Sequence, residues 1–356
     1  MRARVAVLAG DGIGPEVMAE GTRCLIAAAR LQDQEIELHA LPFGGAAIDA
    51  HGDPLPPATL SGCLEADAVL LGAIGGPKWS AADAPLRPES GLLQLRRELG
   101  TFANLRPVRV HPQLADASTL KAEVIAGVDL VFVRELTGGI YFGAKQRDAL
   151  RASDVCSYST AEIERIVRVA AQLARSRRGR LTSIDKANVL ETSRLWREVT
   201  QRVIEREFAG VKLEHLLVDA AAMHLIQRPR DFDVLVTENM FGDILTDEAS
   251  MLAGSLGLLP SASLGEGRRG IYEPIHGSAP DIAGRGIANP YGTILSAALL
   301  LRHSLGLEAG AGALETAVAD ALAAGARTAD LVRPGERACS TREAGEAVLS
   351  RLRRPP

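Results

Sequence analysis

Two aspartates stand four residues apart in the segment ENMFGDILTDEAS, at Asp243 and Asp247. On a helix this spacing places both carboxylates on one face, one turn apart. Two such ligands, with water and substrate in the remaining positions, suit Mg²⁺ or Mn²⁺. The alternative is a pair of solvated acids near the start of a helix. A third acid, Asp219, follows the apolar residues of LEHLLVD. Because an acid at a strand end can point into a cleft, this third acid favours the metal site.

Lysine is rare in this chain, since only five of the 40 basic residues are lysines. Lysine can give up a proton and arginine cannot, so a lysine inside a motif is a candidate for proton transfer. Lys186 lies beside Asp185 and near Asn188 in SIDKANVLE. We interpret it as an ammonium held near a metal, whose positive charge favours loss of the ammonium proton, so that the neutral amine can act as a general base. A surface lysine in a loop is the alternative.

A tyrosine and three arginines complete the set of candidates. Tyr141 lies among glycines in TGGIYFG, where it either packs or donates a proton to a developing carbanion. The arginines each lie beside an apolar segment: Arg96 in LLQLRREL, Arg106 in FANLRPVRV and Arg134 in VFVREL. An arginine in such a place is costly unless it is paired. Each could form a structural ion pair, whereas three that converge would clamp a dicarboxylate.

The first glycine-rich stretch, GDGIGPE, resembles a dinucleotide-binding loop but has the wrong spacing. The Rossmann fingerprint is G-x-G-x-x-G, whereas the glycines here are Gly10, Gly12 and Gly14. The third glycine therefore comes one position early. Pro15 and Glu16 suit the first turn of a helix. The pattern favours a tight strand-to-helix turn rather than a phosphate-binding loop.

Short apolar runs typical of strands alternate with helical patterns along the chain, which predicts an α/β fold with a largely parallel sheet. The expected strands are RVAVLA, EIELHAL, AVLLGAI, DLVFVREL, LTSID, LEHLLVD and FDVLVTEN. A helix is expected from about Ile244, and the Ala/Gly-rich stretch 308–326 is expected to form helix and turn. The segment IYFGAKQRDALRASDVCSYST has neither period. We interpret it as an arm or hairpin that reaches a partner subunit.

The bulk composition narrows the classes of function. A chain of 356 residues exceeds one ordinary core and suggests two domains. The net charge of −4 and the scattered basic residues argue against nucleic-acid or membrane-surface partners. No apolar run approaches the roughly 20 residues of a membrane span. The four cysteines match no metal or disulfide spacing, so we expect thiols in a reducing cytoplasm.

Five segments together resemble one family: FANLRP, VRELTGGIYFG, DKANVLE, ENMFGDILTDE and YEPIHGSAPDIAGRGIANP. They are similar to the β-decarboxylating hydroxyacid dehydrogenases, which include the isocitrate and isopropylmalate dehydrogenases. The resemblance runs from Ala9 to about Pro334. It implies two α/β domains with a mixed, largely parallel sheet and an interdomain cleft, and not a Rossmann fold. Residues 1–101 with 255–356 would form the cofactor-side domain, and residues 102–254 the central domain with the dimer interface and the metal and catalytic residues.

Within this family the chain resembles the enzymes that act in leucine biosynthesis. They oxidise and decarboxylate (2R,3S)-3-isopropylmalate to 4-methyl-2-oxopentanoate and CO₂ with NAD. The resemblance implies that the substrate carboxylates are held by Arg96, Arg106 and Arg134. It implies that Mg²⁺ or Mn²⁺, beside the substrate's C1 carboxylate and C2 hydroxyl, is bound by Asp219, Asp243 and Asp247.

The same resemblance assigns the proton transfers. Lys186 would take the hydroxyl proton as hydride leaves C2, and Tyr141 would protonate the enolate after CO₂ departs. Asp219 would serve both catalysis and substrate binding. Because the family takes Lys186 and Asp219 from the neighbouring subunit, the resemblance makes a homodimer part of the mechanism.

The resemblance places NAD mainly along residues 273–289, which we call the main cofactor segment. The residues that it assigns there are Glu273, His276, Gly277, Ser278, Ala279, Asp281 and Asn289. An acid at the ribose, Asp281, favours NAD because it would repel a 2′-phosphate. A second cofactor segment runs from Gly75 to Glu89. The cofactor contacts assigned outside the main segment are Ile13, Gly75, Gly76, Glu89 and Asn188.

Sister enzymes that act on isocitrate, homoisocitrate, tartrate or D-malate would use the same charged residues. The choice among them depends on RPESGLLQLRR, where Leu92 and Leu93 suit an isopropyl group and Glu89 would repel a third carboxylate. Ser90 stands where isocitrate enzymes place a carboxylate-binding serine, but its neighbours favour isopropylmalate. A metal-dependent phosphoryl-transfer or hydrolytic enzyme would leave Tyr141 without a role. The complete set of catalytic residue types also argues against a non-catalytic nucleotide-binding regulator.

Overall fold

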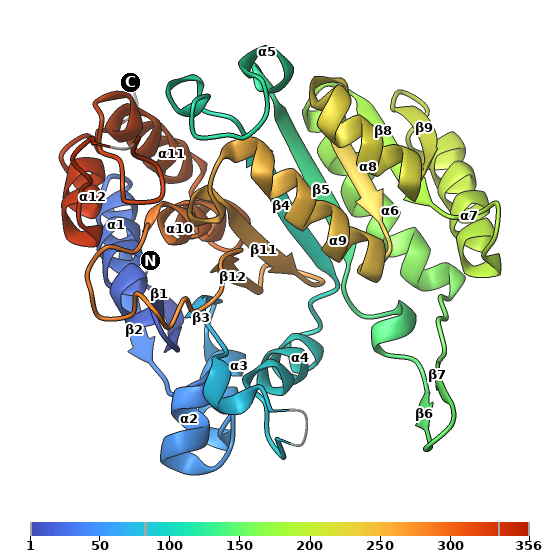
Figure 1. Ribbon diagram of the computed structural model, residues 1–356, viewed down its shortest axis with the longest axis horizontal. Helices are drawn as coiled ribbons and strands as arrows, with labels where there is room; N and C mark the ends of the chain where they lie inside the picture. Colours follow the sequence, from blue (N-terminus) through green and yellow to red (C-terminus); the bar gives the residue numbers. More distant parts are fainter. Residues whose placement is uncertain (1, 82–83, 334, 355–356) are drawn as a thin grey trace. The chain divides into compact units, whose positions relative to one another are not determined.

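The structure is a computed structural model that describes residues 2–81, 84–333 and 335–354. The chain forms two compact units. One, here the terminal unit, comprises Met1–Thr101 and Ser255–Pro356, and the other, the central unit, comprises Phe102–Gly254. In each unit the strands are covered by helices (Figure 1). The predicted α/β class is therefore confirmed, and the strand pairing is mixed and largely parallel.

The sheet of the terminal unit follows the order β2, β1, β3, β12, β11. The strands are β1 (Arg2–Gly10), β2 (Glu35–Ala40), β3 (Ala68–Ala73), β11 (Pro260–Leu264) and β12 (Gly270–Pro274). β1 pairs in parallel with β2 and β3, β12 pairs in parallel with β3, and β11 runs antiparallel to β12. β3 is buried along its whole length, as its unbroken apolar sequence predicts.

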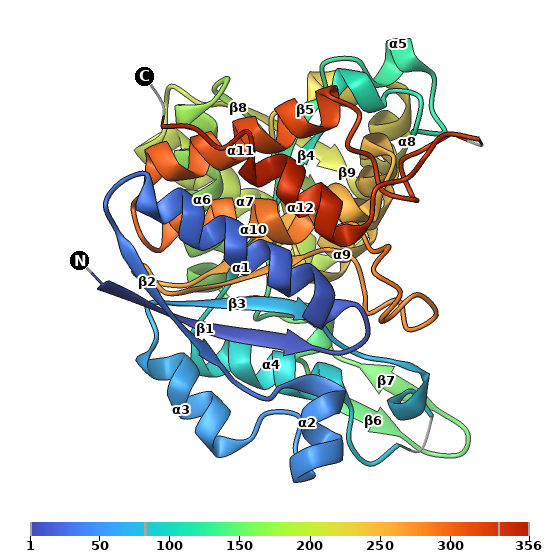
Figure 2. The ribbon, with the colours of Figure 1, turned by 90° about the vertical axis from the view of Figure 1, so that its left-hand side faces the viewer.

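Helices cover both faces of these strands, as Figure 2 shows. On one side lie α1 (Gly14–Arg30), α10 (Tyr291–His303), α11 (Glu308–Ala323) and α12 (Thr341–Leu349). On the other lie α2 (Gly44–His51), α3 (Pro57–Glu65) and α4 (Pro88–Glu98). The core beneath α2 to α4 contains Leu8, Phe43, Val69, Leu71 and Leu95, all at most 1% exposed. The segment 308–326 is helix followed by a turn, which confirms the prediction.

The sheet of the central unit follows the order β4, β5, β10, β8, β9. The strands are β4 (Ala103–Arg109), β5 (Asp129–Glu135), β8 (Arg180–Asp185), β9 (Lys212–Leu217) and β10 (Val234–Thr237). β4 is antiparallel to β5, and the other pairs are parallel. The helices are α5 (Ala122–Ile125), α6 (Thr160–Ser176), α7 (Glu191–Glu207), α8 (Val218–Gln227) and α9 (Asn239–Ser250). α6 packs on β5, β8 and β10, whereas α9 packs on β4 and β5 and contacts α8.

Two boundary predictions in the central unit are wrong. α9 begins at Asn239 and not near Ile244, because the side chain of Glu238 caps it by accepting the N–H of Phe241 at 2.7 Å. β9 ends at Leu217, so that Asp219 lies in the first turn of α8 and not at a strand end. The predicted hairpin is present, since β6 (Lys145–Arg147) pairs antiparallel with β7 (Ala152–Asp154), whereas its contact with a partner subunit stays a prediction.

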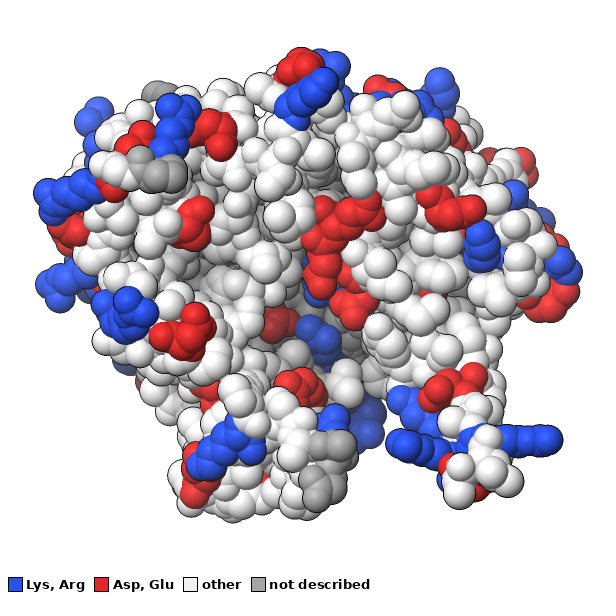
Figure 3. Space-filling model, viewed as in Figure 1, with Lys and Arg blue, Asp and Glu red and all other residues white. Residues whose placement is uncertain are grey.

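The charge distribution, the character of the helices and the state of the cysteines can be compared with what the composition predicts. On the face seen in Figure 3, basic and acidic side chains are interspersed, and acidic side chains gather over α9. None of the helices in the described part of the chain has the length and apolar character to cross a membrane. All four cysteines are free thiols, with Cys24 and Cys63 buried and Cys156 and Cys339 partly exposed.

Candidate active site

One face of the β4–β5 pair carries the two predicted substrate arginines of the central unit, Arg106 and Arg134. The antiparallel register places Asn104 opposite Arg134. Since side chains alternate along a strand, Arg106 projects from the same face as Asn104. α9 packs on these strands and presents Asp243 and Asp247 from successive turns. The structure thus brings two predicted arginines and two predicted aspartates together.

Asp243 is the centre of this group. Arg134 donates to its Oδ1 through Nη1, and Tyr141 donates its hydroxyl proton to Oδ2 at 3.0 Å. Arg134 also donates through Nε and Nη2 to the side-chain oxygen of Asn239, at 3.0 and 2.8 Å. The arginine side chain is 6% exposed and that of Asp243 is 40% exposed. The arginine is therefore held rigidly, while the carboxylate remains accessible to a ligand.

The close approach of α9 to Arg134 depends on Gly242. A Cβ at this position would lie 2.7 Å from Cγ of Arg134 and 3.0 Å from Cγ2 of Thr237. Any larger residue would push the helix off the arginine. The glycine of the segment NMFGD thus allows the contact between α9 and β5.

Arg106 joins the second aspartate to the group. It donates through Nε to Asn104 at 2.8 Å and through Nη1 to Thr246 at 2.8 Å. The same Nη1 lies 3.4 Å from Oδ1 of Asp247, whose side chain is 70% exposed. Two guanidinium groups and two carboxylates with exposed oxygens therefore share one surface. Such a surface can hold an anionic substrate and a hard divalent cation side by side.

Tyr141 lies in the 3₁₀ turn Gly139–Tyr141. Burial, and secondarily the Asp243 carboxylate, raises the pKa of its phenol above the ordinary value. The phenol therefore carries its proton at neutral pH, which is the state that a proton donor needs.

Lys186 and Asp219 form a separate ion pair. Lys186 follows β8, and Asp219 lies one residue into α8, just after the neighbouring parallel strand β9. Their side chains meet with Nζ 2.8 Å from Oδ1. The hydrogen bond from Lys186 lowers the pKa of Asp219. Among the residues that the structure describes, no three His, Cys, Asp or Glu side chains are grouped so that they could hold a metal ion. One chain therefore does not bring Asp219 together with Asp243 and Asp247 as a ligand group.

Arg96 lies in the terminal unit and is ion-paired. From α4 it donates through Nη2 to Oε1 of Glu273 on β12 at 2.8 Å, and the two side chains are 16% and 13% exposed. The predicted substrate arginine is thus held by a predicted cofactor residue. Nε of Arg96 is buried and, among the described residues, has no hydrogen-bond partner, which leaves it one unused donor.

The main cofactor segment follows β12 and contains an unsatisfied histidine. Nδ1 of His276 lies 2.9 Å from the carbonyl oxygen of Gly277. Nε2 is buried and has no partner within the described chain, and burial lowers the pKa of the ring, which keeps it neutral. A Cβ on Gly277 would meet nothing within 4 Å, and Ala279 has a positive φ of 37°. An unused ring nitrogen, open space and a strained backbone are features expected of a ligand-binding loop.

Three other residues assigned to the cofactor, Asn289, Ser278 and Asp281, differ in how far they are buried. Asn289 is 6% exposed, and its side chain accepts the N–H of Tyr291 at 3.0 Å and donates to Asp330 at 2.9 Å. Its amide therefore already serves the start of α10. Ser278 is buried and Asp281 is exposed.

The remaining predicted contacts are distributed over both units. Ile13 is 4% exposed and packs in an apolar cluster with Val17 and Ala288. Glu89 is exposed on α4, and a Cβ on Gly75 would lie 3.0 Å from its Oε1. The other placements are a partly buried Leu92, a Leu93 that is 42% exposed, a partly buried Gly76 and an exposed Asn188. Residues 82–83 of the second cofactor segment lie outside the described residues.

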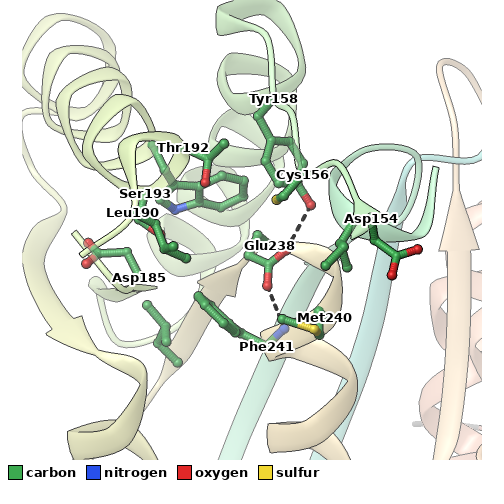
Figure 4. A pocket seen from close by; sticks show the side chains of 13 residues that line it. Asp154, Cys156, Tyr158, Asp185, Leu190, Thr192, Ser193, Glu238, Met240 and Phe241 are labelled. Carbon is green, nitrogen blue, oxygen red and sulfur yellow. Dashed lines mark hydrogen bonds between the residues drawn. The ribbon is translucent and has the colours of Figure 1, made fainter. Parts of the chain in front are cut away.

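Sequence reasoning missed several side chains that organise the site. Asn104, Thr246 and Asn239 hold the two predicted substrate arginines, Arg106 and Arg134. It also missed a pocket of about 310 Å³ at the start of α9, shown in Figure 4. Glu238 lies in it and accepts hydrogen bonds from Tyr158 at 3.1 Å and from the N–H of Phe241. Only the motif ENMFGD hints at Glu238 and Asn239, because their partners lie on distant segments.

Burial raises the pKa of Glu238 above its ordinary value of 4.5. The stabilising contribution of such a group is full below the unfolded pKa and is lost as the pH rises through the folded pKa. The side chain that Glu238→Gln introduces does not titrate, so the melting temperature of this variant should rise relative to that of the wild type as the pH increases above about 4.5. Thermal unfolding of both proteins over a series of pH values measures the difference. Glu205 is exposed on α7, so the melting temperature of Glu205→Gln should depend on pH in the same way as that of the wild type. The same pH dependence for Glu238→Gln as for the wild type would contradict the raised pKa of Glu238.

Comparisons with known proteins match this chain to one family over nearly its whole length. A sequence profile for isocitrate/isopropylmalate dehydrogenase matches residues 4–348. A 3-isopropylmalate dehydrogenase from Anaeromyxobacter dehalogenans is 57% identical, covering 99% of this chain and 100% of the relative. One from Rhodopirellula baltica is 54% identical over 99% of each chain. One from Bacillus subtilis is 55% identical over 98% of each.

Solved structures of related enzymes have the same fold. An isocitrate dehydrogenase from Methylococcus capsulatus matches with a TM-score of 0.86 at 32% identity, covering 98% of this chain and 99% of that one. A β-decarboxylating dehydrogenase from Thermococcus kodakarensis matches with a TM-score of 0.80 at 35% identity, covering 98% and 96%. The sequence motifs, the folds of the two units and these matches lead to one conclusion: the chain belongs to the isocitrate/isopropylmalate dehydrogenase family.

Proposed function

We propose that this protein oxidises and decarboxylates (2R,3S)-3-isopropylmalate with NAD, as a step of leucine biosynthesis. The observation that carries the proposal is the group in which Arg106, Arg134 and Tyr141 surround the carboxylates of α9. Relatives with 54–57% identity over nearly the whole chain, each named 3-isopropylmalate dehydrogenase, support it.

Each side chain of the group has a step that its chemistry suits. Arg106 and Arg134 bind the substrate carboxylates, aided by Arg96 of the terminal unit. Lys186 accepts the proton of the C2 hydroxyl as hydride leaves C2 for NAD. Tyr141, whose phenol carries its proton at neutral pH, donates a proton to the carbon from which CO₂ has departed. The Lys186 and Tyr141 side chains thus handle the two protons of the reaction separately.

The carboxylates of α9 fit a divalent cation. Asp243 and Asp247 offer hard, accessible oxygen atoms, which Mg²⁺ and Mn²⁺ prefer. We propose that they hold the cation together with Asp219 of the partner subunit. When bound, the cation supplies positive charge beside the substrate oxygens on which negative charge develops.

NAD fits the terminal unit. Three features suit the adenosine end of a dinucleotide: the buried Nε2 of His276, which has no partner among the residues that the structure describes, the open space at Gly277 and the exposed carboxylate of Asp281. Gly75 and Gly76 would lie along the same cofactor with Glu89 beside them. An acid at the ribose favours NAD over its 2′-phosphorylated form.

We further propose a homodimer that shares its active sites. Large apolar side chains are exposed on α8 and α9, with Met223 and Ile244 each 61% exposed, and exposed apolar groups of this kind mark interfaces. A second copy would also supply the Lys186–Asp219 pair. The free thiols agree with a reducing compartment, and we propose the cytoplasm.

Sharing of the site predicts complementation between two inactive variants. Mixed, dissociated and reassociated Lys186→Ala and Asp243→Asn subunits should regain about a quarter of wild-type activity, since half of the randomly formed dimers carry one intact site of two. Each variant treated alone is the control. Activity of the mixture no higher than that of the variants alone would contradict a shared site.

The proposed reaction is tested by following NAD reduction at the nicotinamide absorbance with 3-isopropylmalate, isocitrate and D-malate, each with Mg²⁺. The highest kcat/KM is expected for 3-isopropylmalate, because Leu92 and Leu93 offer apolar surface and Glu89 repels a third carboxylate. Ser90 donates to the carbonyl oxygen of Arg87 at 2.6 Å and is thereby already engaged. Absence of reduction with every 2-hydroxy dicarboxylate would refute the proposal, and preference for isocitrate would move the chain to a sister activity.

A further inference from the structure

A buried carboxylate at the start of the opening turn, residues 10–16, has three backbone partners. Asp11 is 5% exposed. It accepts the N–H of Gly75 at 2.8 Å and, at the start of α2, those of Gly45 and Ala46 at 2.8 and 2.7 Å. Its own N–H donates to the carbonyl oxygen of Ala73 at 2.8 Å. Asp11 therefore ties the second cofactor segment to the first strand.

A second carboxylate at the end of the opening turn binds the main cofactor segment. Glu16 accepts the N–H of Gly286 at 2.9 Å and that of Gly284 at 3.2 Å. Both glycines have positive φ, 64° and 74°, so this stretch adopts a conformation that few other residues would support. Between the two carboxylates, Ile13 donates its N–H to the carbonyl oxygen of Ser278 at 2.8 Å.

The opening turn also fits tightly against the main cofactor segment and against the end of β3. A Cβ on Gly12 would lie 2.0 Å from the carbonyl oxygen of Ser278, and one on Gly10 would lie 1.9 Å from that of Ala73. The side chain of Ile13 packs in the cluster that includes Ala279 and Ala288. Because they lack a Cβ, Gly10 and Gly12 of GDGIGPE therefore permit close contact between backbones.

We infer that Asp11 and Glu16 are positioning residues that hold the two cofactor segments in their NAD-binding conformation. The inference rests on the proposed NAD site. Hydrogen bonds from backbone N–H groups to a carboxylate are among the stronger ones in proteins. A loop that is ordered before binding saves the entropy that its ordering would otherwise cost. Both carboxylates act through the loops that they hold, not by touching the cofactor.

The isosteric variants Asp11→Asn and Glu16→Gln test the inference through binding as well as activity. Titration of the fluorescence of NADH should give a Kd about tenfold higher in each variant, since each loses charge-assisted hydrogen bonds. KM for NAD should rise similarly, while kcat and KM for 3-isopropylmalate stay within about twofold. Amide hydrogen exchange without NADH should be faster in residues 75–79 and 276–289 than in the wild type.

Asp233→Asn is the matched control. Asp233 is 1% exposed and accepts the backbone N–H groups of Arg178 and Arg180 at 3.0 and 3.3 Å, within the central unit. This variant should lose stability without weaker NADH binding. A folded Glu16→Gln whose NADH Kd equals that of the wild type would overturn the inference. Glu16 is only partly buried, so this variant decides the matter even if Asp11→Asn fails to fold. A wild-type protein that binds no NADH would instead refute the proposed function.

Discussion

Lys186→Ala is expected to lower the kcat of NAD reduction with 3-isopropylmalate by about 10²–10⁴-fold, the contribution typical of a positioned general base. KM for 3-isopropylmalate should change far less, because the lysine acts on the reacting hydroxyl and not on the carboxylates. Steady-state kinetics at saturating Mg²⁺ and NAD measures both constants. Among the described residues the amine has one polar partner to lose, the exposed carboxylate of Asp219 at 2.8 Å, so global stability should hardly change.

Lys212→Ala is the matched control for this experiment, since Lys212 is an exposed lysine of the same unit at the start of β9. It should leave both kinetic constants unchanged. Equal losses in turnover and in substrate binding for Lys186→Ala would contradict the assignment of a base and indicate a binding role. External amines such as methylamine should restore part of the activity of Lys186→Ala if the missing group is a proton acceptor.

Asp243→Asn is expected to reduce kcat/KM by at least about 10³-fold, because it removes one charged ligand from the proposed cation site. The asparagine retains an oxygen to accept from Arg134, so the fold of α9 over β5 should persist. Titration of Mn²⁺ followed by its electron spin resonance should show much weaker binding. Removing the cation from the wild-type protein with a chelator should abolish activity, and adding Mg²⁺ or Mn²⁺ should restore it.

Asp231→Asn controls for the loss of one negative charge, because Asp231 pairs with Arg228 on the surface of the central unit. Its activity and Mn²⁺ affinity should match the wild type. A folded Asp243→Asn that binds Mn²⁺ as tightly as the wild type would contradict the cation site on α9. Loss of activity with intact Mn²⁺ binding would instead point to the contacts of Asp243 with Arg134 and Tyr141.

Most of the fold follows from local patterns, and its boundaries do not. The apolar runs predicted as strands are strands, because alternation and β-branched residues are local properties of the chain. α9 begins earlier than its periodicity suggested, since its first turn is held by Glu238. The cap forms at the end of β10, and the helical period becomes recognisable only in the turns that follow.

Spacing along the chain by itself determined which candidate groups share a face. Asp243 and Asp247 lie one helical turn apart, so that their shared face is set by the period of their own helix. The types of residue likewise determined the chemistry that is available: hard oxygen ligands, guanidinium groups, one rare lysine and one tyrosine.

Only the tertiary structure decided which of these groups meet. Arg96 pairs with Glu273 across 177 residues, Arg134 with Asp243 across 109, and Lys186 with Asp219 across 33. The opening turn binds residues more than 260 positions away. Such contacts depend on the order of strands in the sheets and on the glycines that let backbones approach. No local pattern encodes that order, because it results from burying the apolar faces of all the elements of a unit at once.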